Sequence, residues 1–177
     1  MTGTSADIGL LALRTVFGLY LAGHGLKKFG LLDGPGLAQT AAVFEKGGFR
    51  PGRPMATLAG VLEVAGGLAL VAGLATPAAA ATVVGVVLVA ASLHVPNGLW
   101  EADKGVELPA LFAAAALTLL YTGPGRISVD HPAGIGDLAG PGPSTLLLAV
   151  VAAAVTATLI RRRSQLRATA SHPQEQQ

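Results

Sequence analysis

The chain of 177 residues contains no cysteine. This absence excludes disulfides, thiolate metal ligands, iron–sulfur clusters and thiol catalysis within the chain. Aromatic residues are also few, at 5% of the chain, with a single Trp. The sequence carries no GxSxG, P-loop or dinucleotide-binding fingerprint in a usable context, because its glycines fall in apolar segments and turns. Sites of these kinds are therefore not expected in the chain.

Charge is scarce as well, since charged residues make up only 12% of the chain, against about 25% in ordinary soluble domains. Hydrophobic residues make up 51%, and the mean hydropathy is +0.59. These values indicate an integral membrane protein whose first partner is the lipid bilayer. The formal net charge is +2, and the cations stand at the ends of apolar runs and in the tail rather than on a folded basic face. A nucleic-acid partner is therefore not expected.

What the sequence does contain is a series of long apolar runs, which predict an all-α bundle of transmembrane helices. The runs cover residues 8–25, 55–75, 78–95, 107–121 and 144–160. The last run is 17 residues long, at the lower limit for crossing a bilayer, and three arginines follow it. Apolar residues recur at helical spacing in a loop segment, 36–46, which we expect to form a short helix along the membrane surface.

Lysine and arginine are distributed very unevenly over the two ends of such a five-span bundle. One end carries Arg126 alone. The other end carries ten cations: Lys27, Lys28, Lys46, Arg50, Arg53, Lys104, Arg161, Arg162, Arg163 and Arg167. The positive-inside rule predicts that the end with ten cations faces the cytoplasm, which places the N-terminus outside and the C-terminus in the cytoplasm.

Glu63 stands at the centre of an apolar run, on a helix face of very small residues. Arg14 has a similar face on the first run. Small residues on one face let another helix approach closely, and an unpaired charge in hydrocarbon is costly. These faces predict close helix packing together with a buried ion pair between Arg14 and Glu63. The predicted packing positions are Gly18, Gly60, Gly66 and Gly67.

The depths of the two charges also favour this ion pair. If Gly25 and Met55 lie level at the same end of the bundle, Arg14 lies about 16 Å and Glu63 about 12 Å from that end. The difference of about 4 Å is within the reach of an arginine side chain. An acid inside the membrane is functional by default, and the alternative is that the Glu63 carboxylate only locks two helices together.

Another set of ionisable side chains falls at the predicted cytoplasmic boundary, on three different runs. His and Glu at a water boundary can relay protons or hydrogen-bond a quinone carbonyl. The alternative is that each of them meets lipid headgroups or caps a helix. No HxxxH or ExxH pair lies on one helix, so no metal site is predicted. The candidate ligand or proton site comprises His24, Lys28, His94 and Glu107.

Arg14 and a series of short motifs extend this pattern through residues 8–131. The motifs are HGLKKFG (24–30), GPGL (34–37), GVLE (60–63), GG (66–67), GLATP (73–77), HVPNGLW (94–100), GVEL (105–108) and GPGRISVD (123–130). Each motif alone is weakly specific. In this order and spacing they resemble the DoxX family of small bacterial membrane proteins.

The resemblance implies a four-helix membrane domain over 1–131, in the bacterial plasma membrane. The run at 144–160 departs from the family pattern. We therefore expect a loop and a fifth, C-terminal transmembrane helix over 132–160, followed by a disordered, basic cytoplasmic tail over 161–177.

The resemblance also implies a membrane subunit associated with quinone oxidoreductases or redox-stress complexes. Such a subunit would be accessory rather than catalytic and would hold no cofactor of its own. Its expected partners are a quinone and a soluble redox enzyme or another membrane subunit. The alternatives are a small transporter or channel that uses Arg14 and Glu63 along a polar path, and a purely structural membrane protein. The sequence shows no clear internal repeat, which argues against a transporter of the common kind.

Overall fold

The computed structural model describes residues 2–135 and 139–171, and over these residues the only regular elements are helices. The α-helices are α1 (Thr2–Lys28), α2 (Gly36–Lys46), α3 (Gly52–Ala72), α4 (Thr76–His94), α5 (Glu107–Thr122) and α6 (Pro141–Ser171). Two short 3₁₀ turns, η1 (Val95–Asn97) and η2 (Glu101–Asp103), connect α4 to α5. The predicted all-α class is confirmed, as is the short helix over 36–46.

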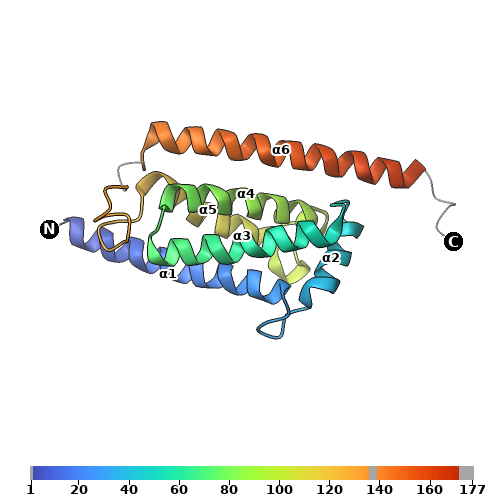
Figure 1. Cartoon of the computed structure of the whole chain (residues 1–177), viewed down its shortest axis with the longest axis horizontal. Helices are drawn as coiled ribbons and strands as arrows, with labels where there is room; N and C mark the ends of the chain where they lie inside the picture. Colours follow the sequence, from blue (N-terminus) through green and yellow to red (C-terminus); the bar gives the residue numbers. More distant parts are fainter. Residues whose placement is uncertain (1, 136–138, 172–177) are drawn as a thin grey trace.

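Helices α1, α3, α4 and α5 form a bundle, and α6 lies along one flank of it against α4 (Figure 1). Helices α1, α3, α4 and α6 are each long and apolar enough to cross a bilayer. Helix α5 has 16 residues, or about 24 Å of rise, but it still reaches from the end where α4 finishes to the end where α1 begins. The chain is therefore a multi-pass membrane protein that contacts the lipid bilayer.

The two ends of the bundle differ in charge. We call the end where α1 begins the N-terminal end, and the opposite end, which carries the ten cations, the basic end. The loop after α5 covers the N-terminal end, and α2 packs on α3 at the basic end. Thr2 and Ser171 lie at opposite ends, as an odd number of crossings requires (Figure 1).

The hydrophobic core lies between α3, α4 and α5, with part of α1 closing it. Its largest fully buried aliphatic side chains are Leu70, Leu119 and Leu120. Much of α4 contributes only Ala and Val, which lets the neighbouring helices approach. A second cluster lies under α2 and comprises Ala41, Phe44, Phe49 and Ala56.

Helix α6 is the least buried of the long helices, and Ser144 is the one fully buried residue among its residues 141–171. The Ser144 hydroxyl donates to the carbonyl oxygen of Leu120 over 2.6 Å. The helix continues through Ser171, so the predicted disorder is wrong for residues 161–171. Arg, Gln, Leu and Ala there are strong helix formers, and they extend the helix past the apolar run. Residues 172–177 lie outside the described residues.

Candidate functional site

The site depends on how α1 and α3 meet. The two helices are antiparallel, and their glycines lie in direct contact. A Cβ atom on Gly18 would lie 2.5 Å from the carbonyl oxygen of Gly67, and one on Gly25 would lie 2.7 Å from that of Gly60. The two contacts agree on one register. In an antiparallel pair, the numbers of facing residues add to the same total, and both glycine pairs have the same total. A Cβ on Gly66 would meet Val83 of α4 at 3.1 Å, so this glycine faces the next helix.

This register separates Arg14 from Glu63, so the predicted ion pair between them is wrong. Arg14 lies level with Val71, about 12 Å along α3 from Glu63. The prediction took Gly25 and Met55 as level, but Gly25 faces a point five residues, or about 7.5 Å, further along α3. The side chains also lean apart, because each tilts toward the N-terminus of its own helix and the helices are antiparallel.

Arg14 instead holds the loop that covers the N-terminal end. It is 2% exposed and donates to the carbonyl oxygens of Pro124, over 3.1 Å, and of Ile127. The Arg14 guanidinium also occupies the space that a side chain at position 73 would fill, which leaves room only for glycine. Gly73 has a φ of +64°, a left-handed conformation that glycine adopts readily. Arg14 therefore has a structural role at the N-terminal end of the bundle, away from Glu63.

The same loop also caps α4. Asp130 is fully buried, and its carboxylate accepts hydrogen bonds from the backbone N–H groups of Ala75, over 2.6 Å, and Thr76, over 2.8 Å. These are donors that the first turn of a helix leaves free, so the carboxylate satisfies them and complements the positive end of the helix dipole. Sequence analysis placed this aspartate in a family motif without finding its role.

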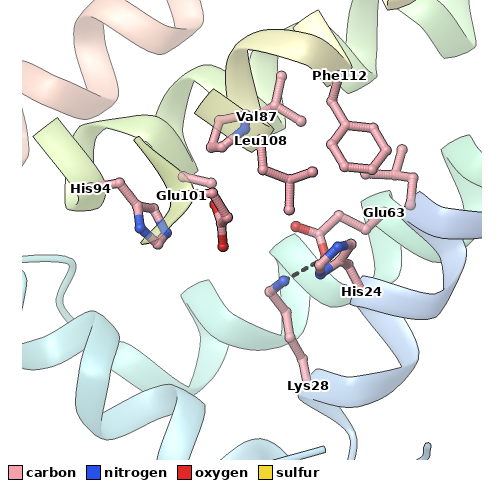
Figure 2. Close-up of a pocket in the computed structure, with 11 residues that line it drawn as sticks. His24, Lys28, Glu63, Val87, His94, Glu101, Leu108 and Phe112 are labelled. Atoms are coloured by element: carbon pink, nitrogen blue, oxygen red, sulfur yellow. Dashed lines mark hydrogen bonds and ion pairs between the residues drawn. The ribbon is translucent and has the colours of Figure 1, made fainter. Parts of the chain in front are cut away.

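A polar cavity of about 220 Å³ opens at the basic end, between α1, α3, α4 and the start of α5. Its polar lining residues are His24, Lys28, Glu63, His94 and Glu101. Figure 2 shows the first three together on one side and the other two across from them. Its apolar wall includes Leu21, Val87, Leu108 and Phe112. The structure therefore brings together three of the four residues of the candidate ligand or proton site.

The partner of Glu63 is Lys28, whose Nζ lies 2.5 Å from Oε2 of the carboxylate (Figure 2). The two side chains are 20% and 5% exposed. Lys28 lies at the end of α1 and leans back into the bundle, while Glu63 leans toward the basic end, so the two approach from opposite directions. The register that separates Arg14 from the carboxylate is thus the one that brings the lysine to it.

The two histidines stand in different surroundings. His24 packs edge-on against the ring of Phe112, with centroids 5.8 Å apart. His94 Nδ1 lies 2.8 Å from the carbonyl oxygen of Lys104. Because a carbonyl oxygen can only accept, Nδ1 carries the proton and Nε2 is the acceptor in the neutral ring. The loop between α4 and α5 thus fixes the tautomer of His94.

Glu107 does not line the cavity, and this part of the predicted site is wrong. Its Oε2 accepts a hydrogen bond from the backbone N–H of Glu101 over 2.9 Å, so it holds η2 in place. Glu101 lines the cavity in its stead. Sequence analysis missed this residue, because the fold of the loop, rather than a helical period, turns it toward the cavity. Its place six residues from Glu107 in a polar loop was the available signal.

Residues 9–95 of the chain match the sequence model of the DoxX family. This segment is a DoxX domain. The matched segment runs from α1 to the start of η1, and it includes His24, Lys28, Glu63 and His94. No curated protein and no solved structure matches the chain.

The DoxX match ends before α5 and α6 begin, so both helices and Glu101 come from outside it. The resemblance drawn from the motifs is confirmed over the matched residues. Within the described residues, no group of three His, Asp or Glu side chains is placed to hold a metal ion. The lining of the cavity offers hydrogen-bonding groups, charges of both signs and an aromatic ring.

Proposed function

We propose that this DoxX protein is a membrane subunit of an oxidoreductase or redox-stress assembly, and that its cavity binds the head group of a membrane quinone. The observation that supports the proposal is the cavity itself, which sets a polar wall against an apolar one. A quinone ring has two apolar faces and carbonyl oxygens at its edge, so it needs both walls. Pockets of this kind usually combine an apolar lining with a few convergent polar groups.

The polar groups match both redox forms of such a head group. The Lys28 ammonium has three N–H donors and uses one on Glu63, which leaves donors for a carbonyl oxygen. His94 Nε2 is an acceptor, so it fits the hydroxyl of a quinol. The cavity thus offers a donor on one side and an acceptor on the other.

We place the protein in a bacterial plasma membrane, with the N-terminal end outside and the basic end in the cytoplasm. Ten cations at one end against one at the other support this orientation. The cavity then opens toward the cytoplasm, where a soluble redox enzyme could dock. The transporter alternative used Arg14 and Glu63 along one polar path, and no observation favours it now that Arg14 is engaged at the N-terminal end.

The experiment is to purify the tagged full chain from native membranes in mild detergent, extract bound quinones, and identify co-purifying proteins by mass spectrometry. His94→Leu removes an acceptor from the cavity, while His131→Leu is a matched control in the exposed loop at the N-terminal end. We expect quinone and redox-enzyme subunits with the wild type and the control, and about tenfold less quinone with His94→Leu, since one hydrogen bond is worth about 1.4 kcal/mol. Equal quinone in all three samples, or none in any, would overturn the proposal.

A further inference from the structure

A second hollow adjoins the cavity and has a different character. It is a groove of about 440 Å³ between α3, α4 and α6, with the end of α2 closing it at the basic end. Most of its lining is aliphatic, including Leu58 and Leu62 of α3, Val89 of α4 and Val155 of α6. Such an aliphatic surface suits a hydrocarbon chain.

The groove and the cavity share a common boundary. Lys28, Glu63, Ala90 and His94 line both of them. One molecule could therefore place a polar head in the cavity and an apolar chain in the groove. The cavity alone is smaller than the ~300–1,000 Å³ of pockets that hold a whole small ligand, so the groove supplies the space that the head site lacks.

Helix α6 forms the outer wall of the groove. Gly85 of α4 lets α6 approach closely, because a Cβ atom at position 85 would lie only 2.9 Å from Val151 of α6. At the basic end, the Arg162 side chain donates to the carbonyl oxygens of Gly47, over 2.7 Å, and Ser92, over 3.0 Å. Its guanidinium also lies over the ring of Phe49, 5.2 Å from the centroid. The wall is thus fixed at the basic end by Arg162 and at the N-terminal end by the hydrogen bond from Ser144 to Leu120, and it is lightly packed between them.

We propose that the groove binds the hydrocarbon chain of the ligand whose head group occupies the cavity, and that α6 selects for ligands with a long chain. The ligand class is a quinone with an isoprenoid chain, and this identity rests on the proposed function. The chain lies between α3 and α6, while the head reaches Lys28 and His94. A helix from outside the family match therefore adds chain specificity to a site whose Lys28, Glu63 and His94 come from the DoxX segment.

The test uses the full chain in nanodiscs and two probes, a quinone with a chain of several isoprene units and the same ring without a chain. Val155→Trp and Leu58→Trp fill the groove from opposite walls. Val150→Trp is the control on α6, at a position that is 61% exposed and does not line the groove. Val61→Trp is the control on α3, since Val61 and Leu58 are both 49% exposed but only Leu58 lines the groove.

We expect both groove variants to bind the long-chain quinone at least tenfold more weakly than the wild type, with binding of the bare ring changed less than twofold. The two controls should bind both probes as the wild type does. If the groove variants bind the long-chain quinone as tightly as the controls, the groove proposal is wrong, while the proposed function stands. If the wild type binds neither probe, the proposed function fails, and the assignment of the groove to a quinone chain fails with it.

Discussion

The Lys28 ammonium lies 2.5 Å from the Glu63 carboxylate and joins the end of α1 to the middle of α3. The pair forms one side of the cavity, so the same contact closes the bundle and provides the polar wall of the site. It is also shielded from water, with the carboxylate only 5% exposed. Structure and proposed function therefore depend on the same two side chains, and mutations must be chosen to separate them.

Removing one member of this pair should destabilise the bundle. Lys28→Met leaves a buried carboxylate without its counter-charge, and we expect a loss of about 3 kcal/mol in the free energy of unfolding in mild detergent. Lys28→Met combined with Glu63→Leu removes both charges at similar volume, and it should unfold within about 1 kcal/mol of the wild type. A double variant as unstable as the single one would contradict the claim that the loss comes from the unpaired carboxylate.

Arg14 and Glu63 should be energetically independent. They lie about 12 Å apart along the α1–α3 interface and share no partner. In a double-mutant cycle with Arg14→Met and Glu63→Gln, we expect the two losses to add within about 0.5 kcal/mol. The cycle between Lys28 and Glu63 serves as the positive control. A coupling between Arg14 and Glu63 as large as that of the control would restore the ion pair that the sequence predicts.

Which cation pairs with Glu63, Arg14 or Lys28, is the part of the structure that the sequence could not predict. The apolar runs located α3, α4 and α5 to within three residues at each end, because each run must match the thickness of a bilayer. Helix α1 begins six residues before its run, and α6 ends 11 residues after its run. The register between α1 and α3 depends on which glycines touch, and this is a property of two surfaces rather than of either helix. A shift of five residues was enough to pair Glu63 with the wrong cation. The faces of small residues were nevertheless visible in the sequence, although their alignment was not.

Close packing at Gly67 should tolerate no side chain. A Cβ atom there would lie 2.5 Å from the carbonyl oxygen of Gly18 and 2.8 Å from the backbone nitrogen of Ala22, and backbone atoms cannot rotate away. We expect Gly67→Ala to lower the free energy of unfolding by about 2 kcal/mol. Gly9→Ala is the matched control on α1, since a Cβ atom there meets nothing within 4 Å. The control should leave stability unchanged or raise it by up to about 1 kcal/mol. Equal effects at both positions would contradict the packing described.

The orientation of the bundle can be measured directly, because the chain has no cysteine of its own to interfere with labelling. Ala102→Cys places an exposed thiol in the loop at the basic end, and Ala133→Cys places one in the loop at the N-terminal end. With an impermeant maleimide on intact cells, we expect labelling at position 133 only, and labelling at position 102 only after lysis. The reverse pattern would invert the proposed topology.

Glu101 and Glu107 show a second limit of sequence reasoning. Both follow α4 within a short polar stretch, and the prediction chose the one that opens α5 because it lies at the predicted membrane boundary. In the folded loop Glu107 supports η2 by accepting from its backbone, and Glu101 lines the cavity. Which of two nearby acids lines a cavity depends on loop geometry. The two histidines and the lysine stand at or near the ends of transmembrane helices, and their common depth was therefore predictable.

The central claim is that the cavity holds a quinone head, and a photoreactive group on the quinone ring tests it most directly. After illumination in nanodiscs, the labelled residues are mapped by mass spectrometry, with excess unlabelled quinone as the competitor. We predict competed labelling on two segments that face each other across the cavity, 24–28 and 94–101. Labelling confined to lipid-facing residues of α1 such as Leu19 and Tyr20, and unaffected by the competitor, would contradict the claim.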